Sequence, residues 1–330
     1  MHPADRGQHE LITPTRPTRV AFFLGSDLTS NIIANRLLPI LLGSHISVLL
    51  LLTRGKTSPR RPLALRRLFF LEHTLLQNYA YPHVDLYGVP GPDRFNSPEG
   101  WRSLAPGRLV VRTVDDVNEP GLVAELADAG IDVAFSVRCY QRFHQPLLDA
   151  LGGPRTDGLF ANLHPGLLPH YRGINTFLRS MQAGEREAGF SLHHLEPDWD
   201  TGEVIGQARF PLDYTRPVLD NMTARTTDAA GLILDLIKKV ATGQPVRARA
   251  QDASQATYFS YPDDADLGEL DRRGIAVFRA SSVIDLLTDA FFGTVADIGH
   301  LRDALIDAVD EAGIPCEYAS SARPLVSLTA

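Results

Sequence analysis

Three side chains of different chemical types lie at or near predicted strand ends: Asn162, His164 and Asp200. Asn162 and His164 belong to the stretch ANLHPG, and Asp200 belongs to the turn-rich stretch EPDWDTG. Side-chain direction repeats every two residues along a strand, so Asn162 and His164 would project to the same side. An amide donor, an imidazole and a carboxylate together suit attack on a carbonyl-type carbon. The amide would stabilise the oxyanion that develops, and the imidazole would accept or donate a proton. The carboxylate would orient the imidazole or raise its pKa. The competing interpretation is that Asn162 and His164 only satisfy loop backbone groups.

The elements that must position these groups alternate between strand and helix over the first 170 residues. Apolar runs predict strands at 20–24, 46–52, 131–137 and 158–164, and helical spacing predicts helices at 28–42 and 118–130. The strands are apolar on both faces, which predicts an α/β fold with a Rossmann-like, mostly parallel sheet covered by helices. In such sheets ligands bind outside the carboxyl ends of the strands, where Asn162 and His164 would lie.

The second half of the chain changes character. Residues 189–195 and 203–211 read as two antiparallel strands around the Asp200 turn, and residues 216–243 read as one long amphipathic helix that ends at Gly243. Residues 251–330 contain 14 Asp and Glu against 5 Arg and include two helical patterns, at 282–293 and 300–313. We therefore predict a flexible lead-in at 1–17, a catalytic domain at 18–250, and a small acidic C-terminal accessory subdomain at 251–330.

The bulk composition narrows the class of protein. A formal net charge of −7 over 330 residues argues against nucleic acid or an anionic membrane as a partner. Two cysteines, Cys139 and Cys316, can form neither a disulfide framework nor a four-cysteine zinc site, which favours a reducing compartment. The first 19 residues lack a signal-peptide core, and the longest apolar run, at 46–52, is too short to span a membrane. We expect a cytoplasmic protein.

Three weaker signals have competing interpretations. The turn GSDLTSN at 25–31 could hold a phosphate or carboxylate on backbone amides of Gly25 and Ser26, or it could be a simple strand-to-helix connection. The basic stretch at 53–67 could meet phosphates or be a solvated loop. His193 and His194 face opposite ways on a strand and complete no zinc spacing, so we expect no metal site.

The spaced pattern NLHPGLLPHYRG followed by DTGEVIGQ resembles the formyltransferase family that uses 10-formyltetrahydrofolate. That family includes methionyl-tRNA formyltransferase, glycinamide ribonucleotide transformylase and sugar-nucleotide N-formyltransferases. The residues that match its pattern are Asn162, His164, Leu167, Leu168, Pro169, Tyr171, Arg172, Gly173, Asp200, Gly202 and Gln207. The chain departs from the pattern at Gly166, where many members have Ser, and we expect this change to alter a loop hydrogen bond while leaving the three chemical groups complete. The resemblance covers roughly residues 18–260 and is strongest at 158–210.

The resemblance implies formyl transfer from 10-formyltetrahydrofolate to an amine, with tetrahydrofolate as product. Asn162 and protonated His164 would stabilise the oxyanion, and Asp200 would hold His164 and help to move the proton. The cofactor-binding residues implied are Arg138, Cys139, Tyr140, Arg142, Leu195, Glu196, Pro197, Asp198 and Trp199. The substrate-binding residues implied are Gly25, Ser26, Arg172 and Gly173.

Several functions remain open within and beyond the family. The acidic tail would repel a polyanion such as tRNA, which argues against methionyl-tRNA formyltransferase. The short lead-in leaves no room for the extra domain that precedes the core of formyltetrahydrofolate hydrolase. The chain is also longer than the bare core of the purine-pathway transformylase. A small-molecule amine acceptor is the favoured partner: an amino sugar nucleotide, an amino acid, hydroxylamine or an antibiotic precursor. A different one-carbon or carbamoyl-like transfer and a non-catalytic folate-binding scaffold are the alternatives. Residues 270–330 would complete the acceptor pocket or form a homodimer contact.

Overall fold

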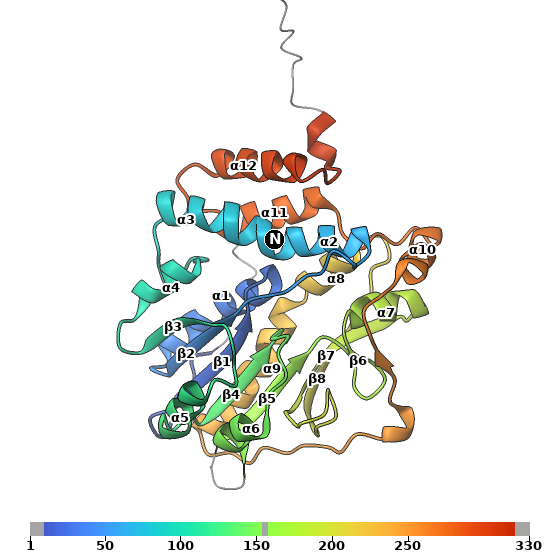
Figure 1. Cartoon of the computed structure of the whole chain (residues 1–330). Coiled ribbons are helices and arrows are strands. Elements are labelled where there is room, and N and C mark those ends of the chain that lie inside the picture. The colour runs from blue at the N-terminus through green and yellow to red at the C-terminus, as the bar shows by residue number, and fades with distance from the viewer. Residues whose placement is uncertain (1–9, 154–157, 321–330) are drawn as a thin grey trace, which may run out of the picture.

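A computed structural model describes residues 10–153 and 158–320, so the outer parts of the predicted lead-in and of the predicted tail, 1–9 and 321–330, lie outside the described residues. The centre of the fold is a seven-stranded sheet with the order β3-β2-β1-β4-β5-β7-β8 (Figure 1). The strands are β1 Arg19–Gly25, β2 Ser47–Thr53, β3 Leu109–Val114, β4 Val133–Val137, β5 Leu159–His164, β7 Glu187–His194 and β8 Val204–Pro211. The first five pair in parallel, whereas β7 and β8 are antiparallel. The predicted α/β, mostly parallel sheet is confirmed.

The sheet is buried on both faces because its central strands are apolar throughout. In β1, Phe22 faces a large core that includes side chains of α1 (Leu28–Gly43) and α9 (Thr226–Ala241). Phe23 faces a second core with side chains of α5 (Pro120–Asp128) and α6 (Gln145–Gly152). Alternating residues of one strand thus bury against two helical layers, which is why the strands read as continuous apolar runs.

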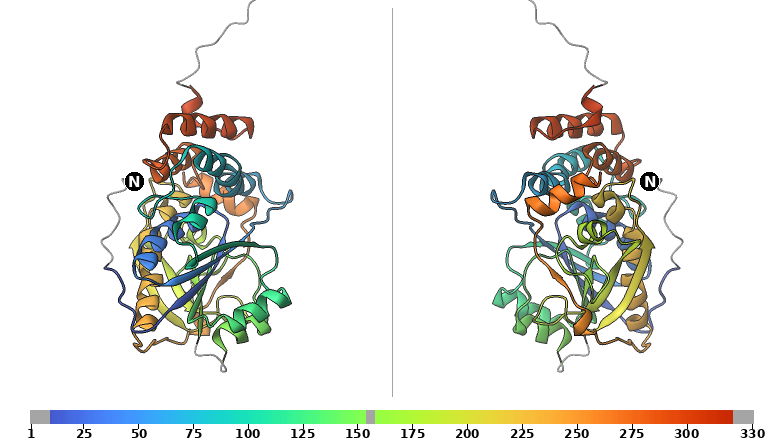
Figure 2. Two further views of the ribbon diagram at one scale, coloured as in Figure 1. Left: turned by 90° about the vertical axis from the view of Figure 1, so that its left-hand side faces the viewer. Right: turned by 90° about the vertical axis from the view of Figure 1, so that its right-hand side faces the viewer.

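Helices fill the remaining connections. They are α2 Leu63–Phe69, the π-helical η2 Phe70–Thr74 and η3 Leu76–Ala80, α3 Tyr81–Tyr87, α4 Pro98–Leu104, α7 Thr176–Ala183, α8 Val218–Thr223, α10 Asp264–Arg272, α11 Ala280–Phe291 and α12 Ile298–Glu311. Short 3₁₀ segments lie at Ala253–Gln255 and Glu317–Ser320, and a small second sheet joins β6 Arg172–Gly173 to β9 Tyr258–Phe259. The segment from α2 to α3 lies with α11 and α12 in a layer above the sheet (Figures 1 and 2). This layer matters for the site because η2 reaches the carboxyl ends of the strands.

Two details differ from the sequence prediction. The helix expected at 216–243 is two helices, α8 and α9, separated at Ala224 and Arg225. The stretch 53–67 is not one loop, because residues from Leu63 onward belong to α2. Between α8 and α9 the apolar pattern continues across the break, which side-chain periodicity cannot detect.

The predicted domain boundaries remain a prediction. Ile12, in the predicted lead-in, is buried, and its backbone N–H donates to Ser44 Oγ at 2.8 Å. Leu287 of α11 and Leu305 of α12 belong to the same apolar core as the helices beside the sheet. Among the residues that the structure describes, no helix is long and apolar enough to cross a membrane.

Candidate active site

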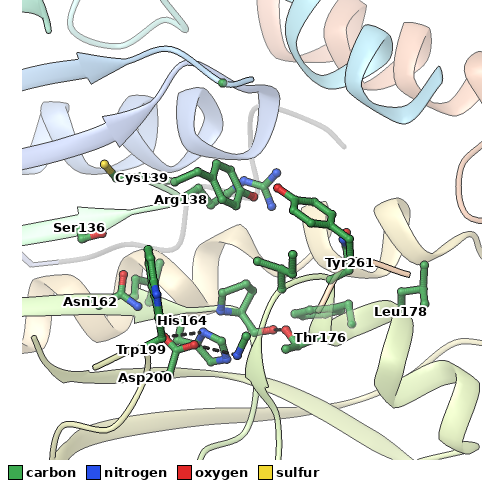
Figure 3. A pocket seen from close by; sticks show the side chains of 18 of the residues that line it. Ser136, Arg138, Cys139, Asn162, His164, Thr176, Leu178, Trp199, Asp200 and Tyr261 are labelled. Atoms are coloured by element: carbon green, nitrogen blue, oxygen red, sulfur yellow. Dashed lines mark hydrogen bonds and ion pairs between the residues drawn. The ribbon is translucent and has the colours of Figure 1, made fainter. Parts of the chain in front are cut away.

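A cavity of about 350 Å³ opens beside the carboxyl ends of β4 and β5. Asn162, His164 and Asp200 all line it, so the turn after β7 does fold back onto the end of β5 as the spacing suggested. Figure 3 shows these three residues with Trp199 on one side of the space, and Arg138 and Tyr261 across from them. The residues predicted to bind the cofactor line the same cavity: Arg138, Cys139, Tyr140, Arg142, Leu195, Glu196, Pro197, Asp198 and Trp199.

Asn162 is oriented by the neighbouring antiparallel strand. In the register of β5 and β7, Asn162 pairs with His193. The Asn162 side-chain nitrogen Nδ2 lies 3.1 Å from His193 Nε2, and His193 Nδ1 lies 2.8 Å from the carbonyl of His194. With the His193 proton on Nδ1, one N–H of Asn162 donates to His193, and the second amide N–H remains to serve a ligand.

His164 is held as a double donor. Its Nδ1 lies 3.4 Å from Asp200 Oδ1, and its Nε2 lies 2.5 Å from the carbonyl oxygen of Tyr171. Two acceptors on the two ring nitrogens require both to carry protons, which is the imidazolium form. Burial opposes this charge, but the Asp200 carboxylate and the Tyr171 carbonyl outweigh it, so the pKa of His164 is raised above its usual value. The site therefore presents a buried positive charge beside Asn162.

Asp200 is locked by its own backbone and by a neighbouring amide. Its φ is 58°, in the left-handed region, and its Oδ2 accepts the backbone N–H of Gly173 at 2.8 Å. His193 Nε2 lies 3.6 Å from the same Oδ1 that faces His164. Burial alone would raise the pKa of Asp200, but the charge of His164 and its hydrogen bond hold it well below its usual range. Asp200 is therefore an anion at neutral pH that neutralises His164.

The departure at Gly166 has a steric cause. A Cβ at this position would lie 2.7 Å from the Tyr171 carbonyl oxygen and 2.8 Å from His164 Nε2. Any side chain at 166 would therefore push apart the two groups that form the His164–Tyr171 hydrogen bond. Glycine here is part of what sets the orientation of the imidazole.

The loop after β5 is fixed by a buried serine and by the glutamine of the motif. Ser191 Oγ accepts the backbone N–H of Leu168 at 3.0 Å and donates to the carbonyl of Gly166 at 2.6 Å. Gln207 Nε2 donates to the Leu168 carbonyl at 2.9 Å and to Ser191 Oγ at 2.8 Å. Gln207 thus supports the loop from behind, which explains its place in the spaced pattern.

The two predicted cofactor segments are tied to each other. The Arg142 guanidinium donates to the carbonyl of Pro197 at 2.9 and 3.2 Å and lies 3.8 Å from the Asp198 carboxylate. Trp199 and Tyr140 line the cavity with 46% and 47% of their surface exposed. Exposed aromatic faces in a cavity are suited to stacking on a planar ligand.

Arg138 belongs to a buried charge cluster that the sequence did not predict. Its Nε lies 2.8 Å from Asp27 Oδ1, and its Nη2 donates to Glu72 Oε1 at 2.7 Å. Asp27 is fully buried and caps α1 by accepting the backbone N–H of Ser30 at 3.1 Å. The start of α1 therefore carries an internal carboxylate where a bound anion would otherwise bind.

The four predicted substrate residues are divided among different places. Gly173 lines the main cavity, whereas Gly25 and Ser26 line a separate cavity of about 270 Å³. The Arg172 guanidinium donates to Gln251 Oε1 at 2.8 and 3.1 Å and is not among the cavity-lining residues. The structure thus does not bring Gly25, Ser26 and Arg172 together with the catalytic candidates.

Sequence reasoning missed Glu72, Tyr258 and Tyr261, which line this cavity, and His193, which contacts Asn162. His193 was considered only as a metal ligand, although strand pairing with the segment of Asn162 was its real signal. Tyr258 reaches the site because β9 pairs with β6, placing it opposite Arg172. Within residues 10–153 and 158–320, no group of three or more His, Cys, Asp or Glu side chains could hold a metal ion.

The comparison with known families agrees with these residues. Residues 111–235 match the sequence model of the formyl transferase family, a range that contains Asn162, His164 and Asp200. A sugar N-formyltransferase from Shewanella sp. is similar in structure, with 15% identity, 77% of this chain and 79% of that chain covered, and a TM-score of 0.47. An N-formyltransferase from Helicobacter canadensis in complex with folinic acid and dTDP-3-aminofucose has 16% identity, coverage of 76% and 72%, and a TM-score of 0.47. Glycinamide ribonucleotide transformylase 1 from Symbiobacterium toebii has 17% identity, coverage of 74% and 99%, and a TM-score of 0.47. The chain thus contains, at residues 111–235, a segment that matches the formyl transferase family, and this segment holds all three candidate catalytic residues.

Proposed function

We propose that this chain is an N-formyltransferase that moves the formyl group of 10-formyltetrahydrofolate to an amine of a small-molecule acceptor. The observation that carries the proposal is the convergence of Asn162, His164 and Asp200 on one cavity, within the segment that matches the family. An amide donor beside a buried imidazolium suits a developing oxyanion, and the paired carboxylate keeps the imidazole charged.

The proposed chemistry divides among the three residues. The free N–H of Asn162 donates to the formyl oxygen as charge develops there. His164 places a positive charge next to the same oxygen, while its ring stays fixed between Asp200 and the Tyr171 carbonyl. Asp200 stays ionised, and because its pKa lies far below neutrality it orients His164 rather than exchanging protons freely.

The cavity residues fit a folate cofactor. A pteridine is planar and carries donors and acceptors on its edge, which matches exposed aromatic rings beside loop backbone. Tyr140 and Trp199 supply such rings, and the backbone of 138–140 and 195–199 supplies polar groups. When bound, the cofactor supplies an activated formyl carbon.

A small acceptor agrees with the rest of the cavity lining. Lys56 and Arg61 lie at the cavity, and the Arg61 guanidinium lies 3.6 Å from the centre of the Tyr261 ring. Such a group can bind an anionic portion of an acceptor, such as the phosphates of an amino sugar nucleotide or the carboxylate of an amino acid. Amino sugar nucleotides and amino-acid or antibiotic precursors are the acceptors that we propose to screen.

The test is calorimetric titration with 5-formyltetrahydrofolate, followed by an assay of tetrahydrofolate release with each acceptor. We expect binding in the micromolar range and acceptor-dependent release. Asn162→Ala should retain cofactor binding but lower turnover about a hundredfold or more, since one oxyanion donor contributes about 2.7–4 kcal/mol. Binding without release would support the scaffold alternative, and near-normal turnover of Asn162→Ala would contradict the assigned role.

A further inference from the structure

One side of the cavity is built from segments outside the matched range 111–235. From the loop after β2 come Lys56 and Arg61, from α2 and η2 come Phe69, Glu72 and His73, and from the region after α9 come Tyr258, Tyr261 and Val277. We call these residues the outer wall. Because the predicted cofactor residues all lie at 138–142 and 195–199, the outer wall is free to contact an acceptor.

Glu72 is the buried carboxylate of the outer wall. Only 6% of its surface is exposed, and it lines the cavity. Its Oε1 accepts from Arg138 Nη2 at 2.7 Å. Among the described residues no hydrogen-bond donor reaches Oε2, and this oxygen is not one of the fully enclosed, unpartnered atoms. A carboxylate oxygen with room for a donor therefore faces the cavity.

The charges around Glu72 do not balance. Arg138 is paired with two carboxylates, Asp27 and Glu72, so the cluster carries one negative charge in excess whenever Glu72 is ionised. His73 does not compensate for it, because burial lowers the pKa of its ring and keeps it neutral. Three other cations line the cavity: Arg142 is engaged with Pro197 and Asp198, Arg61 lies over Tyr261, and Lys56 forms no ion pair with Glu72 among the described residues. A buried excess charge that opens on a cavity is a binding site for a cation.

We propose that Glu72 binds a second, protonated amino group of the acceptor, so that the enzyme selects diamines such as a diamino sugar or a diamino acid. This inference rests on the proposed formyl transfer. The amine that receives the formyl group lies at Asn162 and must be uncharged to attack, whereas the amine at Glu72 stays protonated and fixes the acceptor. No bond changes at Glu72, which makes it a specificity-determining residue.

The protonation state of Glu72 agrees with this role. Burial raises its pKa to about 7, although Arg138 acts in the opposite direction. Without a ligand, the Glu72 carboxylate takes up a proton near neutral pH. An ammonium group bound at Oε2 would take the place of this proton and keep the carboxylate ionised. Binding of a diamine should therefore strengthen from pH 6 to pH 8.

The experiment compares ligands that differ only in the second amine. The protein, saturated with 5-formyltetrahydrofolate, is titrated by calorimetry with 1,3-diaminopropane, 1,5-diaminopentane and 1,6-diaminohexane and with the monoamines of the same lengths. For at least one length the diamine should bind about tenfold or more tightly, since a hydrogen bond to a buried charged group is lost with the monoamine. Glu72→Gln keeps an acceptor for Arg138 and should remove the preference and its pH dependence. Glu99→Gln, which removes an exposed carboxylate paired with Arg102 on α4, is the matched control and should change neither.

Each outcome has a definite meaning. A diamine preference that survives Glu72→Gln, or equal binding of diamines and monoamines at every length, would overturn the inference. Thermal unfolding of Glu72→Gln within a few degrees of the wild-type midpoint shows that a lost preference is not a folding defect. If the variant does not fold, loss of the wild-type preference on lowering the pH from 8 to 6 is the deciding measurement. Failure of 5-formyltetrahydrofolate to bind would instead contradict the proposed function.

Discussion

Replacing Asp200 by Asn tests the electrostatic core of the site. Asn keeps the size of the side chain and an oxygen for the Gly173 N–H, which donates to Asp200 at 2.8 Å, but it removes the negative charge beside His164. The two charged groups are separated by 3.4 Å. At that distance Coulomb's law with an effective dielectric constant of about 20 gives about 5 kcal/mol, before the cost of burying the charges. Pairs of this kind shift a pKa by about 1–3 units in practice.

We expect the pKa of His164 to fall by about 1–3 units in Asp200→Asn. Above the wild-type pKa the imidazolium fraction would fall tenfold for each unit by which the pKa is lowered, and between the two pKa values it would fall by less, so turnover at pH 7.5 should drop by up to about 10- to 1000-fold. Nuclear magnetic resonance of the imidazole nitrogens would report the pKa of His164 directly. The rate of tetrahydrofolate release against pH would show the descending limb moving to lower pH.

The same substitution predicts a stability change with a defined pH window. The folded-state pKa of His164 is raised, so its contribution is present at low pH and is lost as pH rises through that pKa. The folded-state pKa of Asp200 is lowered, so its contribution is present above about pH 4 and is lost on acidification. The difference in free energy of unfolding between wild type and Asp200→Asn should therefore be largest between about pH 4 and 6.5, as measured by urea titration.

The control for Asp200→Asn is Glu125→Gln on α5. Glu125 does not line the cavity, its side chain is 53% exposed, and it lies 2.8 Å from Arg112. Solvent screens an exposed pair of this kind, so the control should keep turnover and the His164 pKa close to wild type. Turnover of Asp200→Asn within threefold of wild type, or an unchanged His164 pKa, would refute the reasoning.

Three further substitutions test the surroundings of the site. Gly166→Ser should displace the imidazole from the Tyr171 carbonyl and so lower both turnover and the pKa of His164. The nitrogen chemical shifts of the imidazole measure this pKa, and an unchanged value would contradict the steric argument. Ser191→Ala removes the hydroxyl that accepts from Leu168 and donates to Gly166. It should lower the free energy of unfolding, measured by urea titration, by about 1–3 kcal/mol. A decrease smaller than the error of that titration would argue against this role of Ser191. Trp199→Ala should weaken the binding of 5-formyltetrahydrofolate about tenfold, because stacking of a planar ring contributes about 1–3 kcal/mol. Calorimetry measures this affinity, and an unaltered value would show that Trp199 does not bind the cofactor.

The sheet could be predicted because its signal is local. The run at 20–24 and the strand that ends at Asn162 and His164 are recognisable from a few neighbouring residues. The antiparallel pair around Asp200 was equally clear, because turn residues separate two strand patterns. The convergence of Asn162, His164 and Asp200 followed from a spaced pattern, and the structure places them together.

The remainder of the site depends on contacts between distant segments. Glu72 reaches Arg138 across 66 residues, and Asn162 reaches His193 across 31. Neither pair has a periodicity or a spacing that marks it in the sequence. The sequence suggested an anion site at the turn of Gly25 and Ser26. In the structure the Asp27 carboxylate fills the start of α1 instead, where it pairs with Arg138, the residue directly after β4.

The split origin of the cavity bears on how such a chain can acquire a new substrate. The proposed catalytic and cofactor residues come from one contiguous stretch between β4 and β8, whereas the outer wall comes from the segment that runs from the end of β2 through η2 and from the region after α9. Exchanging those two flanking segments between relatives would leave Asn162 and His164 on β5, and Asp200 would keep its place if the new segment retains Gln251, which donates to the carbonyls of Asp200 and Gly202. The catalytic rate and the range of acceptors could then change independently of each other. A chimera with the outer wall of a relative should still bind the formyl donor but accept a different amine.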